Sequence, residues 1–128
     1  MTADDLLVLS LNQIGYTKSE NPKGIDYYLG ILNGCLTECF NIEEAYRRLN
    51  GLDMLGDVQF VTNLEDELEY SNFVLINIVS KGVSSRLAGE DNNQMLADYY
   101  ATMYETAKVR PIMTKYVDTE NILQGGEW

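Results

Sequence analysis

The chain contains no histidine and only two cysteines among its 128 residues. The commonest general base and the commonest metal ligand are therefore both missing. Cys35 and Cys39 lack the further soft ligands that a closed zinc site needs. They lie one helical turn apart in a chain without secretory features. We therefore expect two free thiols that pack in the core of a protein from a reducing compartment.

Positive charge is also scarce, with nine Lys and Arg against twenty Asp and Glu and a net charge of −11. Nucleic-acid phosphates and anionic lipids repel a chain this acidic, so we expect neither sequence-specific nucleic-acid binding nor membrane association. Neither a long apolar run nor a signal peptide is recognisable. The charge suits a basic protein partner, or a passage through which DNA slides without sticking.

Catalytic motifs are missing as well. The sequence has no GxGxxG, Walker or Gly-x-Ser-x-Gly pattern, and no set of residues combines a nucleophile, a base and an orienting group. We therefore expect a protein that is not an enzyme and that uses no cofactor and no metal. A carboxylate-metal enzyme stays an alternative, weakened by the absence of histidine.

What the sequence does contain is helical periodicity. One apolar stripe comprises Phe73, Ile76, Val79, Val83 and Leu87, and a second comprises Leu96, Tyr99, Met103 and Ala107, with Tyr100 and Tyr104 on its flank. A polar break at 90–93 makes them a helical hairpin. Gly82 inside the first stripe indicates a close helix approach, and Gly89 is expected to cap that helix.

The first fifty residues supply the helices against which this hairpin packs. Thr2 and Asp5 have the spacing of a capping box at the start of a first helix. Gly15 is expected to end that helix in the left-handed conformation. A second helix is expected to begin near Ile25, to bend or end near Phe40, and to close at 50–51. The sequence thus predicts a mainly α fold, a bundle of about four helices.

Two segments depart from helical periodicity. Residues 57–62 are β-branched and aromatic, which predicts a short strand or extended arm outside the bundle. Pro111 ends the last helix, and the scattered apolar residues after it predict an extended C-terminal tail. We therefore divide the chain into a helical domain, residues 1–110, and a tail, residues 111–128.

The densest charge is an acidic cluster, Glu65, Asp66, Glu67 and Glu69. It could be a calcium site, an acid/base pair or a solvated turn. Its spacing does not match a calcium-binding loop, and neighbouring carboxylates on one turn cannot face each other across a cleft. A helix N-terminus, which favours negative charge, is the interpretation we prefer.

The acidic LEDELEY segment, the helix ending in RLAGEDN and the following helix with Ala and Tyr at turn spacing resemble the head–tail connector proteins of tailed phages. The resemblance covers residues 55–110 and, more loosely, the helices before them. It implies a structural virion protein that assembles in the host cytoplasm. Such a protein forms a ring, commonly dodecameric, that binds the portal and tail proteins and continues the DNA channel.

The resemblance also implies roles for particular residues. The acidic cluster would face the channel or a neighbouring subunit. The tail would contact partners through Met113, Tyr116, Ile122, Leu123 and Trp128. A different class of protein stays open as the alternative, a small acidic inhibitor or DNA mimic that binds a basic partner.

Overall fold

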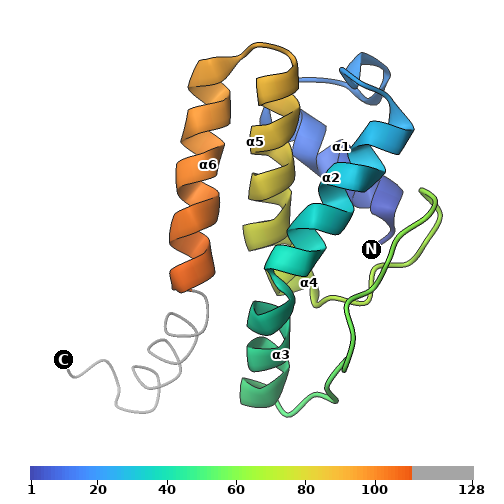
Figure 1. The fold of residues 1–128 in the computed structure, drawn as a ribbon, viewed down its shortest axis with the longest axis vertical. Coiled ribbons are helices and arrows are strands. Elements are labelled where there is room, and N and C mark those ends of the chain that lie inside the picture. Colours follow the sequence, from blue (N-terminus) through green and yellow to red (C-terminus); the bar gives the residue numbers. More distant parts are fainter. Residues whose placement is uncertain (111–128) are drawn as a thin grey trace.

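The computed structural model describes residues 1–110 and is mainly helical (Figure 1). The helices are α1 (Ala3–Gln13), α2 (Ile25–Glu38), α3 (Phe40–Leu49), α4 (Asn72–Val74), α5 (Ser80–Glu90) and α6 (Gln94–Val109). A 3-10 turn, Lys18–Glu20, precedes α2, and a π-helical segment, Leu75–Val79, joins α4 to α5 in one continuous helix. The C-terminal tail lies outside the described residues.

Helix α5 is the centre of the fold. It contacts α1, α2 and α6, and Figure 1 shows α6 beside it, with α2 crossing it at an angle. The expected four-helix bundle is not confirmed, because α3 stands outside this group. It follows α2 after a break at Cys39 and runs beyond the end of α6. Its contact with the core is partial, through the half-buried Phe40, Ile42 and Tyr46.

Most expected helix boundaries are confirmed, because local capping chemistry decides them. Thr2 and Asp5 form the capping box of α1, and Gly15 has a positive φ of 81°. The cap expected at Gly89 is wrong. Helix α5 runs on to Glu90, and the left-handed residue of the turn is Asn92, with φ 59°. Asparagine tolerates this conformation better than most residues with a side chain.

The apolar stripe of the first hairpin helix is only partly as expected. Val79, Val83 and Leu87 are buried, but Phe73 is half-buried and Ile76 is exposed. The buried positions before Val79 are instead Val74, Leu75 and Ile78. The π-helical segment explains the change, because its i to i+5 hydrogen bonds add a residue to the turn and shift the buried face.

The inner face of α6 also differs from the expected stripe. Tyr104, expected on the flank, is 3% exposed, whereas Tyr99 is 57% exposed. Tyr104 packs over Gly82, where a Cβ atom would lie 2.8 Å from two atoms of the tyrosine ring. The close helix approach expected at Gly82 is therefore confirmed.

A long segment without helices, residues 50–71, connects α3 to α4 across the side of α2 (Figure 1); we call it the strap. Of the two alternatives expected at 57–62, the strand is wrong, since no strand is assigned among residues 1–110, whereas a non-helical excursion is what the structure has there. The single β-bridge in this region pairs Thr2 with Glu67. Side chains hold most of the strap in place.

We expect Gly82→Ala to destabilise the fold, because the added methyl group overlaps the Tyr104 ring and the Cys35 sulfur. Overpacking of this kind costs about 1–3 kcal/mol. Gly30→Ala is the matched control, because it lies in α2 with open space around its Cβ position and should stabilise by about 0.5–1 kcal/mol. Urea unfolding midpoints measure both changes. Equal effects of the two substitutions would contradict the close approach.

Candidate functional site

The acidic cluster lies in the strap and not at a helix N-terminus. Helix α4 begins at Asn72, after the cluster, so the preferred interpretation was wrong. Asp66 instead stabilises a turn within the strap. Its carboxylate accepts hydrogen bonds from the backbone N–H groups of Thr62 (2.9 Å) and Asn63 (3.2 Å). These hydrogen bonds lower the pKa of Asp66. The preference of Asp for turns is the signal in the sequence that could have pointed to this role.

The other three carboxylates of the cluster do not share a common site. Glu65, Glu67 and Glu69 are all exposed, and Glu67 binds the N-terminal amine of Met1 at 2.7 Å. The backbone of the cluster anchors the strap to α1, because the Ala3 N–H donates to the carbonyl of Asp66 at 2.9 Å. No group of three or more potential metal ligands occurs within residues 1–110.

A buried carboxylate that the sequence analysis missed lies at the base of the strap. Glu43 of α3 is fully buried, and it accepts hydrogen bonds from the backbone N–H (3.0 Å) and the hydroxyl (2.8 Å) of Ser71. Arg47 Nε lies 2.7 Å from the same carboxylate. The spacing of four residues between Glu43 and Arg47 is the only signal in the sequence, and surface pairs share it.

Arg47 extends this contact into the strap. Its two terminal nitrogens donate to the backbone carbonyls of Asp53 (2.9 Å) and Glu69 (2.5 Å). The neighbouring Glu44 accepts from the backbone N–H groups of Leu55 (2.8 Å) and Gly56 (3.1 Å). These charged groups are all used to hold the chain, which gives them a structural role.

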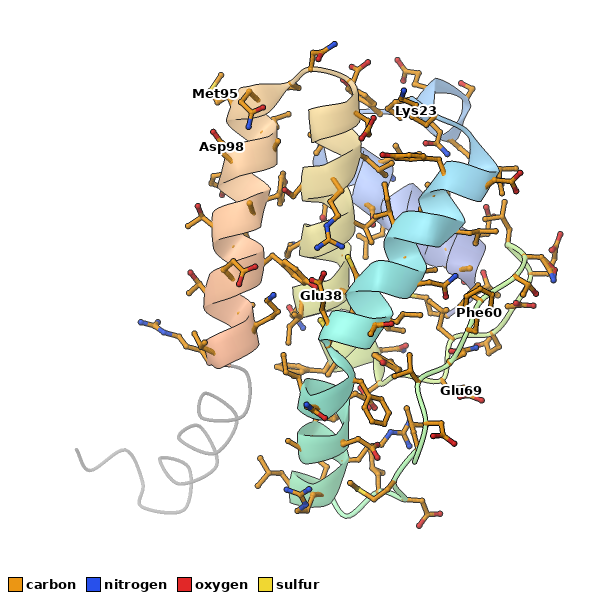
Figure 2. The ribbon with its side chains drawn as sticks, viewed as in Figure 1. Lys23, Glu38, Phe60, Glu69, Met95 and Asp98 are labelled. Carbon is orange, nitrogen blue, oxygen red and sulfur yellow. The ribbon has the colours of Figure 1, made fainter. Side chains whose placement is uncertain are left out.

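The two thiols lie beside a cluster of polar side chains between α2, α5 and α6. Cys35 and Cys39 are both buried and free, as expected. Arg86 donates to the Cys35 sulfur at 3.2 Å, and the Tyr104 hydroxyl lies 3.5 Å from the Cys39 sulfur. The half-exposed carboxylate of Glu38 joins them, since it binds Arg86 and accepts from Tyr104 at 2.8 Å (Figure 2).

The protonation states of this group oppose nucleophilic chemistry. Burial raises the pKa of Cys35 to about 12 and raises the pKa of Cys39, so both stay protonated thiols near neutral pH. Partial burial raises the pKa of Glu38, but hydrogen bonds from Tyr104 and Arg86 outweigh this effect and leave the pKa lowered. A reactive cysteine has a lowered pKa and solvent access, and these thiols have neither.

Two buried hydroxyl groups of α5, those of Ser80 and Ser84, have structural partners, whereas the buried hydroxyl of Ser10 in α1 has none among the described residues. The Ser84 hydroxyl lies 2.8 Å from the carbonyl oxygen of Ser10 and 2.7 Å from the side-chain oxygen of Gln13, and its single proton is donated to one or the other. Gln13 in turn donates to Ser80 at 3.2 Å. Within residues 1–110 no titratable group forms a hydrogen bond with these hydroxyls, so they lack the base that a serine nucleophile requires.

The outer face of α6 carries exposed apolar side chains. Met95 is 80% exposed, Tyr99 57% and Val109 74%. Together with the exposed Thr102 and Thr106 they follow one another at steps of four and three residues. This spacing is typical of a helix that packs along a partner. The tail residues expected to contact partners, Met113, Tyr116, Ile122, Leu123 and Trp128, lie outside the described residues.

A second exposed apolar surface lies at the far end of α3. Leu49, Leu52 and Met54 are each nearly half-exposed, at the point where α3 passes into the strap. Figure 1 shows this end of α3 away from the helices that surround α5. Small groups of exposed apolar residues at ordered positions mark interaction sites more often than isolated ones do.

Comparison with known proteins adds no family. No protein-family model, no curated protein and no solved structure matches the chain. Within residues 1–110 no helix is long and apolar enough to cross a membrane.

We expect Glu43→Gln to destabilise the protein strongly, because Arg47 would keep its charge in a half-buried site without the carboxylate. Removing one partner of a buried ion pair costs about 3 kcal/mol or more. Glu65→Gln is the matched control, because Glu65 is exposed in the strap and should change stability by less than about 0.5 kcal/mol. Chemical denaturation measures both variants, and similar stability in the two would contradict the role of Glu43.

Stability should fall as the pH rises above about 9. Burial holds the pKa of Cys35 at about 12 and raises the pKa values of Tyr28, Tyr70 and Tyr104, whereas the unfolded groups ionise near 9 for Cys and 10 for Tyr. The unfolded chain therefore loses these protons first. Each group should contribute a slope of up to about 1.4 kcal/mol per pH unit.

Urea unfolding between about pH 8 and pH 10.5 measures this slope. Cys35→Ala should make it shallower, because one of the groups is removed. A profile that is flat over this range, or one that Cys35→Ala leaves unchanged, would contradict the assigned thiol environment.

Proposed function

We propose that the protein is a structural virion component, a head–tail connector that assembles into a ring between portal and tail and continues the DNA channel. The exposed apolar face of α6 is the observation that carries the proposal. Together with the resemblance to connector proteins, it favours a chain that works through contacts with other subunits. The polar clusters support the same view, because they hold the strap and the helices together and have no free reactive group.

A closed ring requires two different surfaces on each subunit, since the contact between neighbours is head-to-tail. The outer face of α6 supplies one apolar surface. The group of Leu49, Leu52 and Met54 at the end of α3 supplies a second one of a similar kind. We propose that the α6 face of one copy packs on the α3 end of the next.

The acidic strap fits the inner wall of such a ring. Glu65, Glu67 and Glu69 project carboxylates into solvent, and no lysine or arginine occurs between Arg48 and Lys81. A wall of negative charge repels DNA phosphates and lets the duplex pass without binding. A small acidic inhibitor or DNA mimic remains the second candidate, because the same carboxylates would serve it as a monomer.

The proposal predicts that the protein assembles into rings and that a point substitution on either contact surface prevents this assembly. Light scattering after size exclusion, and electron microscopy, should show rings of the full-length chain. Tyr99→Glu and Leu52→Glu should each give monomers, because a charge in an apolar contact opposes burial. Phe60→Ser is the control, because it removes an exposed apolar side chain from a third surface and should leave the rings intact.

Mixing the two blocked variants makes the test specific for head-to-tail contact. Each variant keeps the surface that the other lacks, so a mixture should form dimers and no larger species. A wild-type chain that stays monomeric at all concentrations would contradict the connector proposal and favour the inhibitor. Rings that survive both substitutions would show that other surfaces form the contact.

A further inference from the structure

Phe60 is an exposed aromatic side chain on a fixed segment. It is 75% exposed in the strap, and Figure 2 shows it at the edge of the molecule beside α2. The preceding residue, Gln59, is tied to the strap by two hydrogen bonds. Its amide nitrogen donates to the carbonyl of Glu67 at 2.7 Å, and its oxygen accepts from the N–H of Glu69 at 2.9 Å.

The residue after Phe60 is fixed in the same way. Asn33 of α2 accepts from the N–H of Val61 at 2.8 Å and donates to its carbonyl at 2.9 Å. Val61 itself is 1% exposed. The backbone is thus held on both sides of Phe60, so binding a partner here costs little conformational entropy.

A groove lies next to Phe60. Its first part is lined by Asp26, Leu29, Gly30, Asn33, Phe60, Val61 and Thr62, and its second part by Asp26, Tyr27, Gly30 and Ile31. The two parts share Asp26 and Gly30, and apart from the chain neighbours of Gly30 and the adjacent backbone of α2, no described atom lies within 4 Å of the place where a Gly30 Cβ would be. The missing side chain of Gly30 leaves the two shallow, mostly apolar parts of the groove adjacent on α2.

The two segments that form the groove contain no positive charge. No lysine or arginine occurs between Lys23 and Arg47 or between Arg48 and Lys81. Asp26 lines the groove, and the carboxylate of Asp66 accepts a hydrogen bond from the N–H of Thr62, another lining residue. Two copies of this surface would repel each other, and a basic partner would be attracted.

We propose that this groove is a docking site for a basic segment of another protein. One apolar side chain of that segment packs against Phe60 and covers Gly30, while flanking lysines or arginines face Asp26 and the carboxylates of the strap. A central apolar anchor with a charged rim is the usual arrangement of a protein contact. The site lies apart from the two contact surfaces of the proposed ring, although it shares the strap with the proposed channel wall. It does not rest on ring formation, because the groove is present in a single copy of the chain.

The test uses the isotope-labelled full-length protein and a synthetic peptide in which lysines flank one leucine. Amide shifts in NMR spectra should concentrate at Gly30, Asn33 and 60–62, and the affinity should fall as salt is added. Two matched peptides separate the contributions. Replacing leucine by serine, or the lysines by glutamate, should abolish the shifts.

Two substitutions in the protein address the groove directly. Phe60→Ser removes the aromatic anchor and Gly30→Leu fills the groove, and each should weaken binding at least about tenfold. Both positions are exposed, and circular dichroism should confirm that both variants fold. Met95→Ser is the control, because it removes an exposed apolar side chain from α6, on another surface (Figure 2), and should bind as the wild type does.

The absence of shifts up to about 1 mM peptide would overturn the proposal. Shifts centred on other residues, or equal binding of the serine or glutamate peptides, would overturn it as well. Because Phe60→Ser should still form rings, loss of peptide binding and loss of assembly are separable. Rings without peptide binding would remove the docking site and leave the connector proposal intact.

Discussion

The strap depends on side chains to satisfy its backbone, because it has almost no strand partner. Buried N–H and C=O groups must find hydrogen bonds, and a connection this long without helices or strands is uncommon in a compact domain. Glu43, Glu44 and Arg47 of α3 hold its first part and its end, and Asn33 of α2 holds its middle. An amide, two carboxylates and a guanidinium thus do what a β-ladder does in a sheet.

The surface features follow from this arrangement. Because the strap is held from within by polar side chains, its apolar residues do not all enter the core. Val61 is buried, whereas its neighbour Phe60 faces solvent. The charges that hold the strap come from α3, and its own carboxylates, apart from Asp66, are exposed. The strap therefore presents both an aromatic side chain and negative charge at fixed positions.

The sequence predicted what local chemistry decides. The capping box at Thr2, the stop at Gly15 and the break near Phe40 each depend on residues within one turn, and each is confirmed. The buried faces depend on more distant partners. In α6, Tyr99 and Tyr104 both continue an apolar stripe, and only the space above Gly82 on α5 selects Tyr104. The π-helical segment leaves no clear signal in the apolar pattern either, so the face shift at Ile76 was not predictable.

The candidate sites were the least predictable part, because they too depend on contacts between distant segments of the chain. Asp66 could be recognised as a turn former, but the burial of Glu43 arises only when the strap folds back over α3 and brings Ser71 to its carboxylate. From the sequence alone, Glu43 and Arg47 look like an ordinary surface ion pair, because nothing in α3 indicates that the strap covers them. Phe60 and Gly30 lie far apart in sequence for the same reason, and the contact between Asn33 and Val61 is what places them in one groove. Long-range polar contacts, rather than apolar periodicity, therefore determine where this protein can meet a partner.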